Sequence, residues 1–168
     1  MLSELYIKNL AVIEKADVVF EAGFNVFTGE TGAGKSIVID AINAILGQRT
    51  SKEIVRSGTD KAVIQAVFTN ISQAVSEKLA AYGYEAEDGE LLVQREISGD
   101  GKGSARISGR PVTVSVLREI GSLLINIHGQ HDNQILLRPD KHIDILDAFG
   151  ETAPLLEEYR AAYRHLLE

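Results

Sequence analysis

The chain has 168 residues, of which 45% are hydrophobic, and its formal net charge is −7. This length suffices for one globular domain with a core of its own. No run approaches the ~18 apolar residues of a membrane span, and the amino terminus lacks the basic and apolar regions of a secretory signal, so no membrane partner is expected. The absence of cysteine excludes disulfides and thiolate metal sites and agrees with a reducing cytoplasm. Because domains that bind DNA by themselves are more often basic, the net charge gives no independent support for nucleic-acid binding.

The first part of the chain is rich in β-prone segments. Residues 5–10 and 16–20 are predicted to form two strands, which are expected to be antiparallel. Residues 24–28 (Phe-Asn-Val-Phe-Thr) form a further short apolar run behind Gly23. We therefore expect a third strand there, leading directly into a glycine-rich segment.

That segment, residues 29–36, reads Gly-Glu-Thr-Gly-Ala-Gly-Lys-Ser and matches the phosphate-binding loop pattern G-x-x-x-x-G-K-[ST]. An apolar run at 37–46 follows and closes on Gly47, which predicts a helix. Strand, glycine loop and helix are the context that this pattern requires. The sequence therefore indicates a site for a nucleoside triphosphate, ATP, with Mg²⁺.

The residue types of this loop each suit a task in phosphate binding. Glycines permit backbone angles that side chains forbid, so that successive N–H groups form an anion nest at the positive end of the following helix. Lys35 is expected to reach the β- and γ-phosphates as a catalytic cation, and the Ser36 hydroxyl is expected to ligate Mg²⁺. The predicted cofactor-binding residues are Gly29, Glu30, Thr31, Gly32, Ala33, Gly34, Lys35 and Ser36.

The middle of the chain alternates strand and helix patterns. After an irregular polar stretch at 48–58, a strand is predicted at 62–68 and a helix at 72–81 with Ser72 as its cap. Two further strands at 91–97 and 103–107 flank an Asp-Gly turn, which predicts a hairpin. Residues 109–112 are interpreted as another turn.

Two helices and a buried strand are expected beyond this hairpin. Thr113 is the predicted cap of a helix whose apolar residues continue at helical spacing up to Leu124. Residues 123–127 are interpreted as a buried strand that runs into His-Gly-Gln-His at 128–131. Pro139 suits the first turn of a helix that Gly150 ends.

The last segment of the chain has a heptad pattern, unlike the segments before it. From Pro154 onward, apolar residues follow the 4, 3, 4 spacing of a heptad seam, which indicates the start of a coiled-coil arm, although an amphipathic surface helix would look similar. The seam consists of Leu155, Tyr159, Ala162 and Leu166. Because the pattern is still running at Glu168, we expect the chain to be a fragment of a longer protein.

Two parts of an ATP-hydrolysing site have no counterpart in the sequence. A P-loop ATPase needs an apolar strand that ends in Asp, usually beside a catalytic Glu, to hold Mg²⁺ and orient water. No such strand occurs, and no Ser-Gly-Gly signature is present. The chain is therefore expected to bind ATP without turning it over.

The chain resembles the SMC, RecF and RecN class of ATPase heads, because it combines half of an ATP site, a β-rich lobe and the start of a coiled coil. Within this class its sequence motifs are most similar to those of the RecN-like bacterial DNA repair ATPases. The matching segments are residues 5–13, 28–36, 40–41, 46–49, 55–58 and 124–131. The resemblance implies an α/β P-loop fold, the amino-terminal half of an ABC/SMC-type head. Residues 1–150 would form the half-head with its β-rich lobe, and residues 151–168 would begin the coiled-coil arm.

The resemblance also implies roles for two residues outside the loop. Gln130 stands where the family has a catalytic glutamine that reaches toward Mg²⁺ and the attacking water. Arg56 or Arg49 would correspond to an arginine that contacts phosphate, and Arg56 is taken as the candidate.

The implied partners are the carboxyl-terminal half of the same head, a second head in a homodimer and DNA through the complete assembly. The complete protein would be an ATPase that acts in double-strand break repair and recombination, cytoplasmic and associated with the nucleoid. A small P-loop nucleotide or metabolite kinase is the alternative, and an ABC transporter subunit or a dimerisation module with a vestigial ATP site are further ones. The heptad tail argues against the kinase, the absent signature against the transporter, and the intact Lys35-Ser36 pair against the vestigial site.

Overall fold

The computed structural model describes residues 1–28, 34–127 and 139–167. The chain divides into two compact units, Met1–Asn126 and Ile127–Glu168. The boundary that the sequence predicts at residue 150 stays a prediction.

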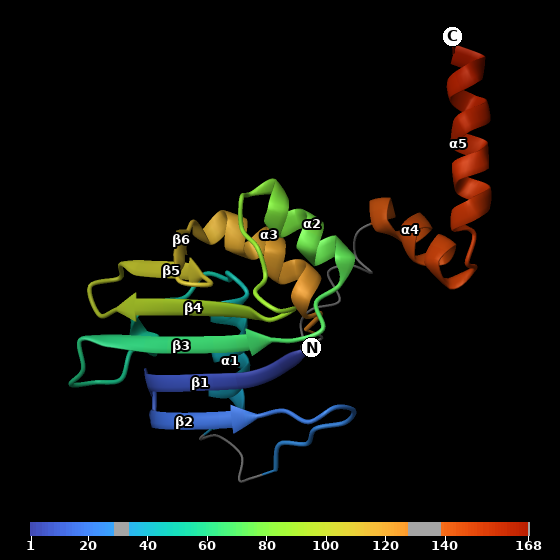
Figure 1. Ribbon diagram of the computed structural model, residues 1–168. Coiled ribbons are helices and arrows are strands. Elements are labelled where there is room, and N and C mark those ends of the chain that lie inside the picture. The colour runs from blue at the N-terminus through green and yellow to red at the C-terminus, as the bar shows by residue number, and fades with distance from the viewer. Residues whose placement is uncertain (29–33, 128–138, 168) are drawn as a thin grey trace. The chain divides into compact units, whose positions relative to one another are not determined.

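The first unit is built on a six-stranded sheet with the order β2-β1-β3-β4-β5-β6 (Figure 1). All neighbouring strands are antiparallel. The strands are β1 (Leu2–Leu10), β2 (Ile13–Val19), β3 (Lys61–Phe68), β4 (Leu91–Ser98), β5 (Gly103–Ile107) and β6 (Arg110–Val112). The predicted strands at 5–10, 16–20, 62–68, 91–97 and 103–107 are confirmed, as is the antiparallel pairing of the first two.

The strands form because their apolar residues alternate. In β3, Ala62, Ile64, Ala66 and Phe68 are buried, while the residues between them are half-buried. Since successive side chains point to opposite faces of a sheet, this alternation gives one covered face and one more open face. β4 alternates in the same way and lies beside β3 in register.

Three helices belong to the first unit. They are α1 (Lys35–Ile45), α2 (Gln73–Ala81) and α3 (Val114–Leu124). α1 crosses behind the sheet in Figure 1 and contacts β1, β3 and β4. Its buried residues on that side are Val38, Ala41, Ile42, Ala44 and Ile45.

Side-chain caps begin α2 and α3 as the sequence predicts. The Ser72 hydroxyl accepts a hydrogen bond from the Val75 N–H, and the Thr113 hydroxyl accepts one from the Val116 N–H, each at 3.4 Å. These bonds satisfy N–H groups that the first turn of a helix leaves without intrahelical partners.

Three sequence predictions of local structure are wrong. Residues 24–28 form no strand, and their apolar side chains are exposed, with Phe24 92% exposed. Residues 123–124 end α3, and 125–127 are irregular rather than a buried strand. A strand needs a neighbour for its backbone hydrogen bonds, and the described residues provide none at either place. Residues 110–112, interpreted as a turn, instead form the edge strand β6 after a turn at Ser108 and Gly109.

The second unit contains α4 (Pro139–Phe149) and α5 (Ala153–Leu167), which confirms the two predicted helices. Thr152 links them: its hydroxyl donates to the Asp147 carboxylate at 2.9 Å, and its carbonyl accepts the Leu156 N–H. The predicted seam of α5 lies on the surface, with Leu155 66% and Leu166 80% exposed. No helix of the described residues has the length and apolar character to cross a membrane.

Candidate nucleotide-binding site

The start of α1 carries the described part of the predicted phosphate-binding loop. Gly34 is the N-cap, Lys35 and Ser36 are the first helical residues, and both of their side chains are exposed. The first intrahelical bond runs from the Val38 N–H to the Gly34 carbonyl at 3.0 Å. The other predicted loop residues, Gly29, Glu30, Thr31, Gly32 and Ala33, lie outside the described residues.

This helix start differs from those of α2 and α3. Its N-cap is a glycine, so no capping side chain can accept from the first N–H groups, whereas hydroxyl groups cap α2 and α3. A Cβ built on Gly34 would meet nothing within 4 Å, so the backbone there can be approached closely. An uncapped amino end of a helix offers N–H groups and a positive dipole to an anion. The arrangement therefore fits a phosphate group.

A rigid base holds this helix start in place. Ala41 and Ala44 of α1 are fully buried and Ile45 is 1% exposed. After the helix, Gly47 adopts φ +83°, which glycine tolerates and which ends α1 where the sequence predicts. Lys35 and Ser36 thus stand at the end of an element that is fixed against the sheet.

Two segments that the sequence resemblance singled out, 5–13 and 55–58, meet beside β1. The Ala11 N–H donates to the Ile54 carbonyl at 2.7 Å, and the Arg56 N–H donates to the Asn9 carbonyl at 3.0 Å. Asn9 and Ala11 have positive φ angles of 57° and 47°, which residues other than glycine rarely adopt. These two backbone hydrogen bonds therefore join the segments and hold the strained turn between β1 and β2.

The side chain of Arg56 also binds the turn between β1 and β2. Its Nη1 donates to the Val12 carbonyl at 2.8 Å and approaches the Ala11 carbonyl at 3.5 Å. Arg49 is exposed and follows the carboxyl end of α1, opposite to the end that carries Lys35. A phosphate contact of Arg56 or Arg49 stays a prediction, and Gln130 lies outside the described residues.

Sequence reasoning missed Arg95, the one charged residue that is buried in the described part of the chain, 5% exposed. Burial lowers the pKa of its guanidinium from the usual value, and the nearby charge of Arg118 lowers it further. Arginine stays charged despite such a shift. The signal in the sequence is its position: Arg95 occupies a covered-face site of β4, between Val93 and Ile97 in the alternation.

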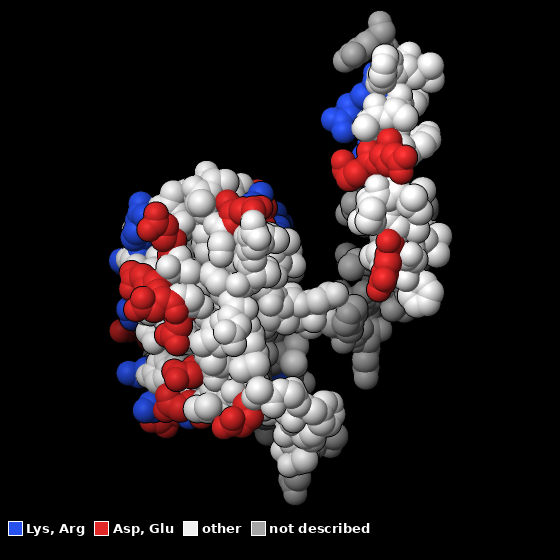
Figure 2. Space-filling view, turned by 45° about the vertical axis from the view of Figure 1, so that its right-hand side comes forward, with Lys and Arg blue, Asp and Glu red and all other residues white. Residues whose placement is uncertain are grey.

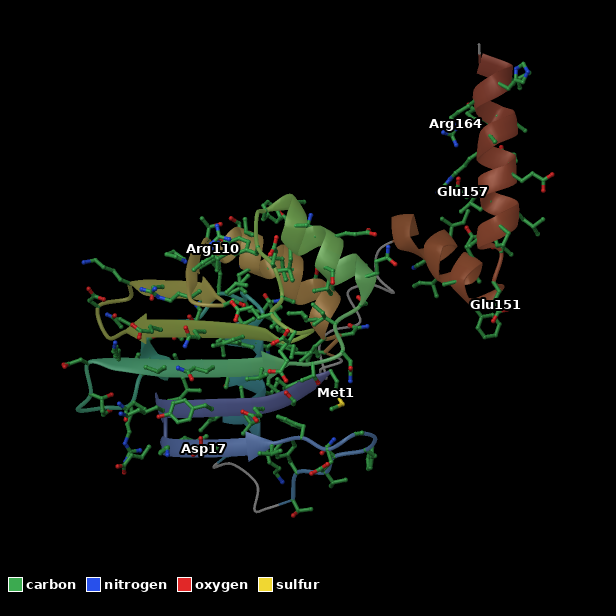
Figure 3. All side chains as sticks on the ribbon, viewed as in Figure 1. Met1, Asp17, Arg110, Glu151, Glu157 and Arg164 are labelled. Atoms are coloured by element: carbon green, nitrogen blue, oxygen red, sulfur yellow. The ribbon has the colours of Figure 1, made fainter. Side chains whose placement is uncertain are left out.

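The surface charges of the first unit are mixed. Basic and acidic side chains intermingle on the left of Figure 2, and no patch of one sign dominates that face. Local ion pairs contribute to this mixing. Lys15 lies 3.2 Å from Asp17, and Lys61 lies 3.0 Å from Glu96. Figure 3 labels Asp17 on β2. This face has no basic stripe of the kind that binds DNA electrostatically.

A P-loop sequence that opens a buried helix behind a β-rich sheet defines the class of the protein, the amino-terminal part of a P-loop ATPase head. Comparison with solved structures supports this fold. The Smc head domain with a coiled coil and joint from Pyrococcus yayanosii has a TM-score of 0.68 at 21% identity, covering 99% of this chain and 36% of that one. The recombination mediator protein RecF with ATP has a TM-score of 0.60 at 20% identity, covering 88% and 37%.

The chain belongs to the AAA domain family, whose model matches residues 4–167. It is similar to the DNA repair protein RecN of Bacillus subtilis strain 168, with 45% identity over all of this chain and 30% of that protein. The RecN of Vibrio cholerae is 38% identical over 98% of this chain and 30% of its own length. The chain thus spans about a third of the curated relatives that it matches and resembles the amino-terminal head part of RecN.

Proposed function

We propose that this chain is the ATP-binding half-head of a RecN-like ATPase that acts in DNA double-strand break repair and recombination. The observation that carries the proposal is the glycine-capped start of α1, with Lys35 and Ser36 exposed, at the end of a P-loop sequence. Relatives named DNA repair protein RecN support the biological setting. The complete protein would then be cytoplasmic and associated with the nucleoid.

In this proposal the residues at the start of α1 bind the triphosphate. Lys35 places a cation at the β- and γ-phosphates, while backbone N–H groups from Gly34 onward donate hydrogen bonds to phosphate oxygens at the positive end of the helix. The Ser36 hydroxyl is a hard oxygen ligand of the kind that Mg²⁺ prefers. Ser36 would hold the ion beside the triphosphate, where it would neutralise negative charge. Gln130 is proposed to orient water and to touch the metal.

Hydrolysis in this proposal requires partners. The carboxyl-terminal half of the same head would supply the acidic residues, and a second head would supply the signature segment across the nucleotide. The exposed apolar residues at 24–28 and in the seam of α5 are consistent with surfaces that further segments cover. ATP binding would shift the population toward engaged heads, and the assembly would couple this shift to DNA.

Titration of the purified chain with ATP, with and without Mg²⁺, tests the binding step. Calorimetry should detect one nucleotide per chain with tighter binding when Mg²⁺ is present, and phosphate release should stay at background. Absence of binding would contradict the proposal. Steady turnover by the purified 168-residue chain, sensitive to changes at Lys35, would contradict the assignment of hydrolysis to missing segments.

The alternative, a small P-loop kinase, predicts a different outcome. A kinase would transfer the γ-phosphate to a nucleotide or metabolite acceptor, so incubation with labelled ATP and candidate acceptors should then yield labelled product. In the proposed half-head, no acceptor is labelled.

In the complete protein, Gln130→Ala should leave ATP binding intact and impair hydrolysis.

A further inference from the structure

Arg95 lies in an apolar layer beneath the carboxyl end of α1. Along the covered face its cross-strand neighbours are Ile64 on β3 and Ala105 on β5, both buried. Its Nη1 donates to the Ala44 carbonyl, in the last turn of α1, at 3.4 Å, and its buried Nε has no hydrogen-bond partner. Among the described residues, a full charge is therefore held in the core with a single carbonyl as its hydrogen-bonded partner.

Arg118 of α3 contacts the residue that follows the same end of α1. Its Nε donates to the Gly47 carbonyl at 3.1 Å. The backbones are also close, because a Cβ on Gly47 would lie 2.6 Å from the Arg118 nitrogen. No ion pair joins Arg95 or Arg118 to a carboxylate within the described ranges. Carbonyl groups at the negative end of the α1 dipole are thus their hydrogen-bonded acceptors there.

Stability alone does not account for Arg95. Desolvation of an unpaired charge is costly, and apolar residues of similar volume in place of buried charges are often neutral or stabilising. The interaction of a cation with a helix carboxyl end offsets only part of that cost. The buried charge of Arg95 therefore indicates a role beyond folding.

We propose that Arg95 and Arg118 form an arginine pair that positions α1 and its dipole for the nucleotide phosphates. The inference rests on the proposed ATP site and adds two positioning residues to it. The pair fixes the carboxyl end of α1 to β4 and α3, so the amino end that carries Lys35 and Ser36 is held in one orientation. The two charges also face the phosphates along the helix axis and attract them through the protein interior.

The size of the effect follows from the length of the helix. Eleven residues span about 16 Å at a rise of about 1.5 Å per residue. At an effective dielectric constant of about 20, a unit charge at that distance changes the binding of another unit charge by about fivefold. Solvent screening reduces this value, so a loss of about threefold is expected for Mg·ATP on removal of one arginine. Mg·ADP carries less negative charge and should lose less.

The test compares Arg95→Met with Arg95→Lys and with Arg106→Met in the full chain. Arg106 lies on β5 opposite Gln94, outside the buried face, so its replacement removes the same charge without touching α1. Calorimetry gives the Kd for Mg·ATP and Mg·ADP, and circular dichroism gives Tm. Arg95→Met should keep or raise Tm, lose about threefold in affinity for Mg·ATP and lose less for Mg·ADP. Arg95→Lys should restore most of the affinity, and Arg106→Met should match the unaltered chain.

Several outcomes would overturn the inference. Unaltered Mg·ATP affinity in Arg95→Met would do so, as would equal losses for Mg·ATP and Mg·ADP that Arg95→Lys does not restore. If Arg95→Met fails to fold, the same comparison at the more exposed Arg118 decides the question. Failure of the unaltered chain to bind Mg·ATP would instead overturn the proposed function, and this inference with it.

Discussion

Lys35 stands exposed at the first position of α1, where the sequence pattern and the helix geometry agree. We expect Lys35→Ala to weaken Mg·ATP binding at least tenfold, because hydrogen bonds to charged groups contribute about 1.5–3 kcal/mol. Calorimetric titration checks this, with Lys52→Ala as the control, since Lys52 is also an exposed lysine but lies in the 3-10 helix η1 (Lys52–Ile54). Equal affinities of the Lys35→Ala and unaltered chains would refute the phosphate assignment.

Arg56 illustrates a residue whose neighbours only the structure reveals. Its guanidinium donates to carbonyls of the strained β1–β2 turn. Arg56→Met should therefore lower the free energy of unfolding of the nucleotide-free chain by about 1 kcal/mol, because the Val12 carbonyl loses its donor. Urea denaturation measures the change. Arg49→Met is the control, since Arg49 is exposed, and it should leave the stability unchanged.

The same two variants also address the phosphate contact that the family resemblance implies. Whichever arginine contacts phosphate should lower Mg·ATP affinity when it is replaced. A stability loss in Arg56→Met without a change in affinity would leave Arg56 with a structural role only.

At the scale of elements, α3 approaches the C-cap residue of α1 at backbone distance near Gly121. A Cβ on Gly121 of α3 would lie 2.5 Å from the Leu46 carbonyl oxygen, and the atoms that it meets are backbone. Gly121→Ala should therefore destabilise the fold by about 1–3 kcal/mol through overpacking, less the gain of about 1 kcal/mol that alanine brings to a helix. Thermal denaturation checks the sign.

Ser122→Ala provides the matched control for this prediction. Ser122 is the next residue of α3 and is exposed, so the substitution changes helix propensity without entering the contact. A Gly121→Ala chain that melts at or above the temperature of the Ser122→Ala chain would show that the two helices can move apart at little cost.

At the scale of the whole molecule, the core lies entirely in the first unit. Every buried hydrophobic residue of the described part falls between Leu2 and Ile120. A chain truncated after Asn126 should therefore unfold cooperatively within about 2 °C of the 168-residue chain. Calorimetry of both chains measures this, and a large drop in Tm would mean that the second unit stabilises the first.

We expect that the second unit does not fold by itself. Its helices expose Ile143, Phe149, Leu155 and Leu166, and a segment of this size buries too little apolar surface to fold alone. Residues 127–168 prepared by themselves should give weak helical signal without a cooperative transition. Circular dichroism distinguishes the two results.

Local patterns by themselves determined most of the elements. Alternation in β3 and β4, the caps Ser72 and Thr113, and Gly47 at the end of α1 all act over a few residues, so they are readable without the fold. The loop sequence at 29–36 predicts a phosphate site for the same reason, because in loops of this pattern the backbone N–H groups of consecutive residues bind the phosphates. The class of ATPase head follows from these features and the family resemblance.

Tertiary structure alone decided what depends on distant neighbours. The runs at 24–28 and 123–127 are apolar enough for strands, yet strands need partners, and pairing is not encoded in a single segment. Arg56 on the turn carbonyls and Arg95 under the end of α1 likewise depend on residues 44 to 51 positions away. Side-chain surroundings of this kind arise only when the sheet and helices pack, so sequence alone could name these arginines but not their roles.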